Sequence, residues 1–177
     1  RVPIRPERAI RSSLGLHAES TFVLVKIHTD DGLTGLGEVS ATALWSGEDH
    51  VTATHAVGHL LAPHLLGQDS GAIETLTRRM DTVLAGHPFA KAGIEMALWD
   101  LLGKRAGLPL YRLLGGPVRD HVTTKFSISG AAPERAAELA AWAVAEGFRT
   151  VKVKVGLDPD QDVARVRAVR AAIGPDV

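Results

Sequence analysis

Cysteine is absent from the 177 residues of this chain. A disulfide framework, a thiolate zinc site, an iron–sulfur cluster and a cysteine nucleophile are therefore excluded for these residues. The chain also has no excess of positive or negative charge, because 20 basic residues balance 20 acidic ones. This balance favours neither a nucleic acid nor a membrane surface as a partner. The apolar runs are far shorter than a membrane span and no secretory signal opens the chain, so we expect a soluble, cytoplasmic protein.

The length allows one large domain or two small ones, each with a buried core. The chain begins at Arg1 rather than at a methionine, and it stops at Val177, where the pattern indicates a connection between a helix and a strand. We therefore expect both ends to be cut, so that these residues belong to a longer protein.

The first third of the chain has the pattern of an antiparallel sheet. Residues 22–28 and 33–39 are rich in apolar and β-branched side chains, and the Asp-Asp-Gly sequence at 30–32 between them is typical of a hairpin turn. Gly35 and Gly37 predict a bulge or a close approach of another backbone. We further expect a third strand within residues 3–11 and connecting loops at 12–18 and 40–47.

A helical block follows this sheet. Ser46 and Asp49 have the spacing of a capping box, which predicts a helix to about Leu66. Apolar side chains recur every three or four residues over 73–83, which is typical of an amphipathic helix. A longer helix is predicted from Pro88 to a C-terminal cap at Gly107, and a short one at 110–114.

The Gly-Gly-Pro sequence at 115–117 is the best domain boundary in the chain. Beyond it we expect a strand, a helix, a second strand and a second helix, at residues 122–128, 133–146, 150–155 and 158–173. This alternation predicts a parallel sheet. We place an N-terminal domain at 1–118 and the start of a second domain at 119–177.

Two lysines one residue apart are the most informative feature of the second strand. Side chains alternate along a strand, so Lys152 and Lys154 share one face, with Cα atoms about 7 Å apart, and the valines occupy the other. Each ammonium group disfavours protonation of the other, which can make a lysine a usable base. The plain alternative is a solvated face of an open sheet that guards an edge. A closed barrel with helices outside and a polar site within also accounts for one polar and one apolar face.

Four stretches in order resemble the enolase superfamily, in its muconate lactonizing enzyme and mandelate racemase branch. They are DGLTGLGE at 31–38, AKAGIEMALWDL at 90–101, PLYRLLGG at 109–116 and KVK at 152–154. The resemblance implies an α+β capping domain, an antiparallel sheet plus helices, followed by the first two β/α units of a TIM-like (β/α)7β barrel.

The resemblance also implies a reaction, the magnesium-dependent removal of a proton next to a carboxylate to give an enediolate. Lys154 matches the family's base, and Lys152 matches the neighbour that lowers its pKa. The Mg²⁺ ligands are expected beyond Val177, so this chain alone has no metal site and should be inactive. Residues expected to contact the substrate are Leu14, His17, Trp45, Ser127 and Ser129. A small carboxylate is the expected partner, and homo-oligomers are expected by resemblance only.

Rival interpretations remain at this point. His55 and His59 have the spacing of two zinc ligands, but Ala56 stands where a zinc protease has its glutamate, which favours a surface helix. Glu38, Glu95 and Asp100 are expected in helical or capping-domain roles, Asp100 as a partner of the lysine four residues on. A non-catalytic binding or structural module is the alternative to an isomerase or lyase. A Schiff-base aldolase is disfavoured, because it makes no use of the capping domain.

Overall fold

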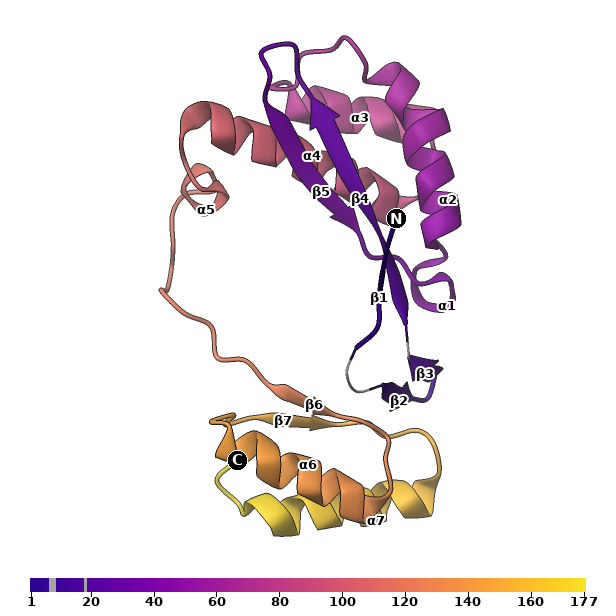
Figure 1. Ribbon diagram of the computed structural model, residues 1–177, viewed down its shortest axis with the longest axis vertical. Coiled ribbons are helices and arrows are strands. Elements are labelled where there is room, and N and C mark those ends of the chain that lie inside the picture. The colour runs from indigo at the N-terminus through magenta and orange to yellow at the C-terminus, as the bar shows by residue number, and fades with distance from the viewer. Residues whose placement is uncertain (7–8, 18) are drawn as a thin grey trace. The chain divides into compact units, whose positions relative to one another are not determined.

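The chain forms two compact units in the computed structural model, which describes residues 1–6, 9–17 and 19–177, with only the backbone described at His17. The first unit consists of Arg1–Ile4 and Thr21–Val118, and the second of Arg5–Ser20 and Arg119–Val177 (Figure 1). Residues 5–20 thus belong to the second unit, whereas the domain boundary placed from the sequence between residues 118 and 119 assigns them to the first.

The first unit contains a sheet of three strands, in the order β1 (Val2–Ile4), β4 (Ser20–His28), β5 (Thr34–Val39). β4 and β5 are antiparallel, and Gly32 in the turn between them has φ 85°, a conformation that glycine adopts without strain. The predicted hairpin is confirmed. The third strand is shorter than the predicted range of 3–11.

The helices of the first unit are α1 (Ala43–Ser46), α2 (His50–His55), a π-helical turn η1 (Ala56–Leu61), a 3-10 turn η2 (Ala62–His64), α3 (Ile73–Val83), α4 (Pro88–Ala106) and α5 (Leu110–Leu113). Asp49 caps α2, and its capping-box partner is Thr52 rather than the predicted Ser46. The expected loop at 40–47 includes α1, so it is only partly a loop. The α4 helix ends at Gly107 as predicted, with φ 65°.

Helix α4 packs directly on strand β5, and two glycines make this approach possible. A Cβ atom on Gly37 would lie 1.8 Å from the carbonyl oxygen of Gly93, and one on Gly35 would lie 2.1 Å from that of Ala97. Both distances are far below any real contact, so the close approach predicted at these glycines is confirmed. Ile94, Leu98 and other apolar side chains of α4 then complete a core with residues of the sheet, α2, η1 and α3.

The second unit contains two small pairs of strands. β2 (Ile10–Ser12) and β3 (Gly15–His17) form an antiparallel hairpin, so the prediction of a loop at 12–18 is wrong. β6 (Phe126–Ile128) and β7 (Val151–Val153) are parallel neighbours. Both are shorter than predicted, because each ladder extends only as far as a partner strand accompanies it.

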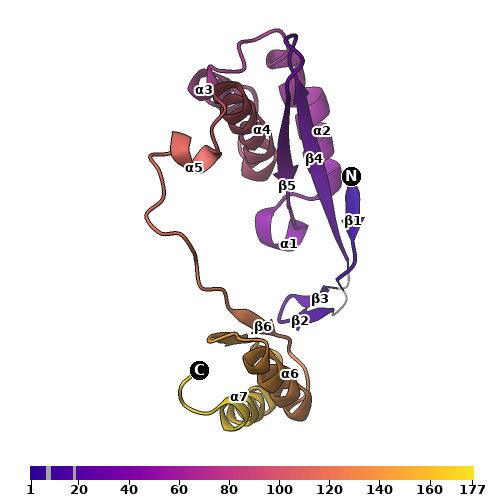
Figure 2. The ribbon, with the colours of Figure 1, turned by 60° about the vertical axis from the view of Figure 1, so that its left-hand side comes forward.

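Two helices lie side by side on one face of the β6–β7 pair, α6 (Pro133–Ala145) and α7 (Pro159–Ile173) (Figures 1 and 2). Ile128, Ala136, Ala140 and Val169 form the buried core between them, and Val151 and Val153 pack against it. The order strand, helix, strand, helix is as predicted. Their identity as the first units of a barrel stays a prediction. None of the described helices combines the length and the hydrophobicity that a membrane-spanning helix needs.

Candidate functional site

Lys152 is the middle residue of β7 and Lys154 directly follows its last residue, next to strand β6. In the parallel register Lys152 pairs with Ser127, and the N–H of Lys154 donates to the carbonyl of Ile128 at 3.1 Å. The valines on either side of Lys152 pack against the core, whereas Lys152 is exposed and Lys154 is half-buried. The strand therefore has one apolar face toward the helices, and its lysine side chain is on the other.

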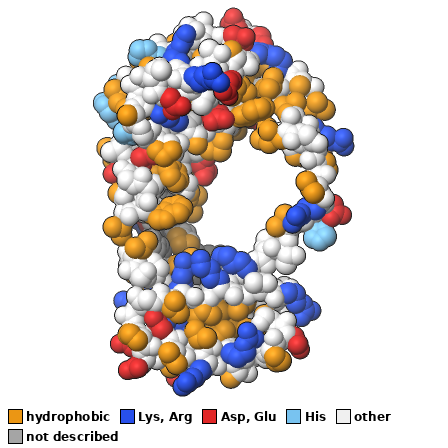
Figure 3. All heavy atoms as spheres, turned by 180° about the vertical axis from the view of Figure 1, so that it is seen from behind, with side chains coloured by type: hydrophobic (Ala, Val, Ile, Leu, Met, Phe, Trp, Pro, Cys, Tyr) orange, Lys and Arg blue, Asp and Glu red, His pale blue; other side chains and the backbone are white. Residues whose placement is uncertain are grey.

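A third lysine belongs to this open face. The ammonium group of Lys125 donates to the hydroxyl of Ser127 at 2.6 Å, and Ser127 is the register partner of Lys152. In Figure 3 a band of Lys and Arg side chains lies along the strand side of the second unit, and other basic side chains are scattered over the rest of its surface. Positive charge concentrated in this way attracts an anion such as a carboxylate. We define Lys125, Lys152 and Lys154 as the lysine face.

The β2–β3 hairpin is fastened to the end of β6. The N–H of Arg11 donates to the Ser129 hydroxyl at 2.8 Å, and the N–H of Gly130 donates to the Arg11 carbonyl at 3.0 Å. Between the hairpin and the loops that follow β6 and β7 lies an open groove of about 580 Å³. Its lining comes from Arg11–Ser13, Gly15, Leu16, Gly130–Ala132, Leu157, Asp158, Gln161 and Arg165.

The predicted substrate contacts differ in their surroundings. Leu14 is 51% exposed at the hairpin turn, and among the described residues the groove lining includes Leu16 instead. Ser127 and Ser129 accept the hydrogen bonds given above, from Lys125 and from the Arg11 backbone. The side chain of His17 lies outside the described part of the structure. A contact between any of them and a substrate stays a prediction.

Trp45 belongs to the first unit, and a buried carboxylate that the sequence did not predict, that of Glu48, lies three residues further along the chain. Trp45 is 75% exposed, with its ring edge toward Phe89 at a centroid distance of 6.2 Å. Glu48 is only 3% exposed and accepts the N–H groups of Phe89 and Ala90 at 2.8 and 3.1 Å. It thereby binds the start of α4, where free N–H groups and the helix dipole favour an anion. No local pattern in the sequence identified Glu48, since its partners lie 41 and 42 residues away.

The other acidic candidates have structural partners. Asp100 pairs with Lys104 at 2.6 Å, as the sequence predicted, and also accepts the N–H of Leu36 at 2.8 Å. The Lys104 ammonium group and this N–H hold the pKa of Asp100 below its usual range, although partial burial opposes them. Glu95 accepts a hydrogen bond from the indole of Trp99 at 3.3 Å. These contacts support the predicted helical role of Glu95 and Asp100.

A metal centre would need several histidine or acidic side chains of the described residues close together. The rings of His55 and His59 lie tilted to each other with their centroids 5.1 Å apart, on a surface helical segment. Within the described ranges, however, no group of three or more His, Cys, Asp or Glu side chains could hold a metal ion.

Comparison with known families gives two matches. Residues 1–115 match the N-terminal domain model of mandelate racemase / muconate lactonizing enzyme, and residues 134–177 match a model described as enolase C-terminal domain-like. The relatives with detectable similarity include racemases, epimerases, a cycloisomerase and dehydratases.

Individual relatives resemble the chain over nearly its whole length. An N-succinyl-L-Arg/Lys racemase from Bacillus cereus is 36% identical over 177 residues, which are 100% of this chain and 47% of that protein. The crystal structure of N-succinyl Arg/Lys racemase from Bacillus cereus matches with a TM-score of 0.96, at 34% identity, over 99% of this chain and 47% of that one. A dipeptide epimerase from Cytophaga hutchinsonii, complexed with Mg and the dipeptide D-Ala-L-Val, matches with a TM-score of 0.92, at 35% identity, over 98% and 47%. The chain thus spans about half the length of the curated relatives it matches.

Proposed function

The chain belongs to the mandelate racemase / muconate lactonizing enzyme family of the enolase superfamily, and on this premise we propose that it supplies the base of an enzyme that removes a proton next to a carboxylate. Lys154 is the proposed base. Lys152, its neighbour on the same face of the strand, attracts the substrate carboxylate in this proposal. The observation that carries this proposal is the lysine face, which lies opposite the apolar core of the second unit.

The chemistry accounts for lysines at this place. A proton next to a carboxylate is very weakly acidic, because its removal adds a second negative charge to the molecule. Cationic groups fixed in advance near the developing charge lower that barrier. A general base contributes about 10²–10⁴-fold to the rate, so Lys154 supplies only part of the acceleration.

The proposed reaction also needs magnesium, whose protein ligands are not expected among these residues. No described group in the chain fits the ion, whereas the Cytophaga hutchinsonii structure contains Mg. We infer that the ligands lie in the part of the relatives that continues beyond this chain, and that the complete protein requires the ion to stabilise the enediolate.

An N-acylated amino acid is the substrate class that the relatives favour. N-succinyl amino acids and dipeptides both carry a carboxylate next to an acylated Cα–H, and they are named for several of the relatives. The proposed reaction is then inversion at that carbon, a racemisation or epimerisation. Cycloisomerisation and dehydration in other relatives use a proton at the same position relative to the carboxylate, so they are the alternatives to be tested.

The test is deuterium exchange at Cα in the full-length protein that carries this chain, with magnesium, across a panel of N-succinyl amino acids, dipeptides, muconate-like diacids and sugar acids. We expect exchange with an N-acylated amino acid, measured by NMR or mass spectrometry. Addition of EDTA should abolish it. Lys154→Ala should lower it by about 10²–10⁴-fold, and Lys154→Arg should fail as well, because a guanidinium group stays protonated.

Lys26→Ala is the matched control, since Lys26 is also an exposed strand lysine but lies on β4 in the first unit. It should exchange at the wild-type rate. Undiminished exchange in Lys154→Ala would remove the assigned base. A full-length protein that binds carboxylates but exchanges none of them would favour the non-catalytic binding module instead.

A further inference from the structure

Arg165 is a buried arginine whose hydrogen bonds go to the ends of both strands of the β6–β7 pair. It lies on α7 and is 3% exposed. Its Nε donates to the carbonyl of Ala131 at 2.5 Å, just beyond β6. Its Nη1 donates to the carbonyl of Lys154 at 3.1 Å and to the carboxylate of Asp162 at 2.5 Å. One guanidinium group thus connects both loops with its own helix.

Asp162 holds the same segment from its other side. Its Oδ2 accepts the N–H groups of Gly156 and Leu157 at 2.6 and 3.2 Å. The Gly156 N–H and the Arg165 guanidinium hold the pKa of Asp162 below its usual range, against the effect of burial. The carboxylate therefore remains charged at neutral pH, and the pair of opposite charges is maintained.

The main chain of Lys154 is fixed on both sides by these contacts. Its N–H donates to the Ile128 carbonyl in the strand ladder, and its carbonyl accepts from Arg165. Two residues on, Gly156 has φ 95°, and a Cβ atom there would lie 3.2 Å from that of Ser13. The loop after β7 therefore has little freedom to adopt another path.

The unfavourable desolvation of the Asp162–Arg165 ion pair indicates a role beyond packing. Removing an ion pair from water is unfavourable, and apolar side chains of the same size often stabilise a fold as well or better. Other residues of α7 and α6 already provide the apolar core of this unit, among them Val169 and Ala140. The Asp162–Arg165 pair instead forms hydrogen bonds with the backbone around Lys154.

We propose that Asp162 and Arg165 are positioning residues for Lys154, fixing the backbone from which its amine reaches the substrate. The inference rests on the proposed function, because it concerns the base assigned there. A base has to lie within hydrogen-bonding distance of its proton, and a displacement of about 1 Å can cost about 10²-fold in rate.

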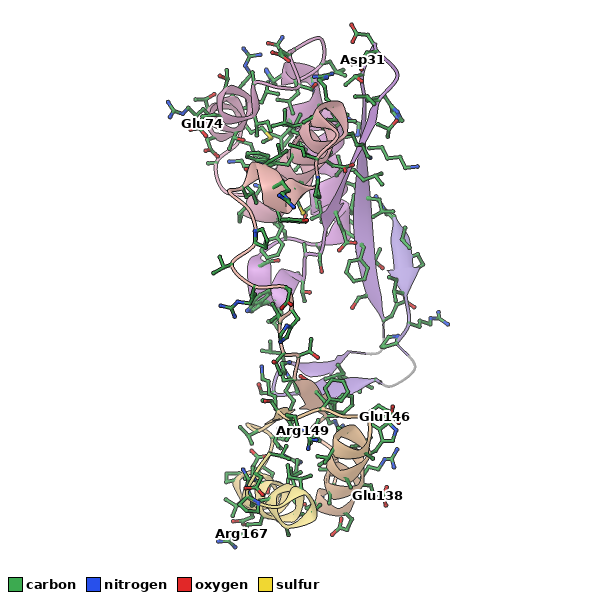
Figure 4. All side chains as sticks on the ribbon, turned by 90° about the vertical axis from the view of Figure 1, so that its left-hand side faces the viewer. Asp31, Glu74, Glu138, Glu146, Arg149 and Arg167 are labelled. Carbon is green, nitrogen blue, oxygen red and sulfur yellow. The ribbon has the colours of Figure 1, made fainter. Side chains whose placement is uncertain are left out.

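The test compares Arg165→Met, Arg165→Lys and Asp162→Asn in the full-length protein, with Arg167→Met as the matched control. Arg167 is on the same helix, is exposed and points outward (Figure 4). Two quantities are measured, amide hydrogen exchange by residue, and kcat and KM for the exchange of the substrate Cα proton. Asp162→Asn nearly preserves the shape of the site, so it keeps the test valid if Arg165→Met folds poorly.

In Asp162→Asn we expect amide exchange at Gly156 and Leu157 to rise about tenfold or more, because their N–H groups lose the carboxylate that accepts them. In Arg165→Met the same two amides should exchange faster, because Asp162 loses the guanidinium group that holds its carboxylate in place. We expect kcat to fall about 10–100-fold while KM changes little. Arg165→Lys should recover only part of kcat, because an ammonium group keeps the pairing with Asp162 but lacks the planar fork that reaches both carbonyls. Arg167→Met should match the wild type in both measurements.

Two results would overturn the inference. Faster amide exchange spread evenly over the second unit would indicate a general structural role. Faster exchange at 156 and 157 with an unchanged kcat would show that Lys154 does not depend on the pair. Failure of the proposed function looks different: the wild-type protein itself would exchange no Cα proton, and the catalytic inference would fall with it, whatever the amide exchange shows.

Discussion

Each unit contains two neighbouring strands with one buried and one open face, and the two open faces differ in charge. On the β4–β5 pair Lys26 lies opposite Leu36, and Leu24 lies opposite Glu38, all four exposed. Charges of both signs are thus mixed with apolar side chains. The open face of the β6–β7 pair instead has the three lysines of the lysine face, with Ser127 among them.

The difference separates a structural surface from a candidate site. The diagonal pair of Lys26 and Glu38 has opposite charges, which is favourable or neutral. Lys152 instead lies opposite Ser127, and the other charged side chains of the segments 125–128 and 151–154 are both lysines. A fold that keeps repelling charges together loses stability, and such losses are typical of functional sites. The buried sides differ as well, since β5 contacts α4 through glycines, whereas β6 and β7 cover a core rich in alanine.

The largest effect is expected where the first unit is packed most closely. Gly37→Ala would place a methyl group 1.8 Å from the Gly93 carbonyl oxygen, which belongs to the α4 backbone and cannot rotate away. We expect a loss of about 1–3 kcal/mol or more in the free energy of unfolding, measured by urea denaturation with amide exchange resolving the two units. Protection should fall in the first unit only.

Gly58→Ala is the control for this substitution. Nothing lies within 4 Å of the added methyl group there, and Gly58 is exposed within the helical turn η1. Alanine is favoured over glycine in a helix by about 0.5–1 kcal/mol, so this variant should be as stable as the wild type or more so. Equal destabilisation by both substitutions would contradict the role assigned to the contact between β5 and α4.

A smaller effect is expected from acid. The folded state lowers the pKa of Asp100, through Lys104 first, so its contribution to stability is complete above the ordinary aspartate pKa of about 3.9. That contribution is lost as the pH falls through the lower folded pKa. Asp100→Asn should therefore cost about 1 kcal/mol or less at pH 7, and the difference from the wild type should shrink as the pH falls below about 4.

Urea denaturation at pH 7, 4 and 3 checks this expectation. A difference that stays constant over the whole range would mean that the carboxylate charge of Asp100 contributes nothing, and that only the shape of the side chain matters.

Local patterns in the sequence predicted most helices and the hairpin correctly, because caps and apolar periodicity act over a few residues. The α4 helix between Pro88 and Gly107 is an example. They failed for β6, which begins at Phe126 rather than at Val122, because a strand needs a partner along its whole length. They also missed β2 and β3, whose fastening to Ser129 joins residues 118 positions apart.

The same distinction between local patterns and long-range contacts applies to the candidate site. The lysines were found because strand alternation alone puts Lys152 and Lys154 on one face. Arg165 was not, because its partners Ala131 and Lys154 come together only once β6, β7 and α7 are assembled. Glu48 was missed for the same reason.

The smallest effect is the sharpest test of the comparison between the two open faces. Lys152→Gln removes one charge from the lysine face, so the second unit should become more stable by a few tenths of a kcal/mol at low salt. The gain should vanish near 1 M salt, where screening acts within about 3 Å. Lys26→Gln should instead leave the first unit unchanged or slightly weaker, because Glu38 is its diagonal neighbour. Urea denaturation with residue-resolved amide exchange measures both, and a change of the same sign in both units would mean that the lysine face carries no repulsion.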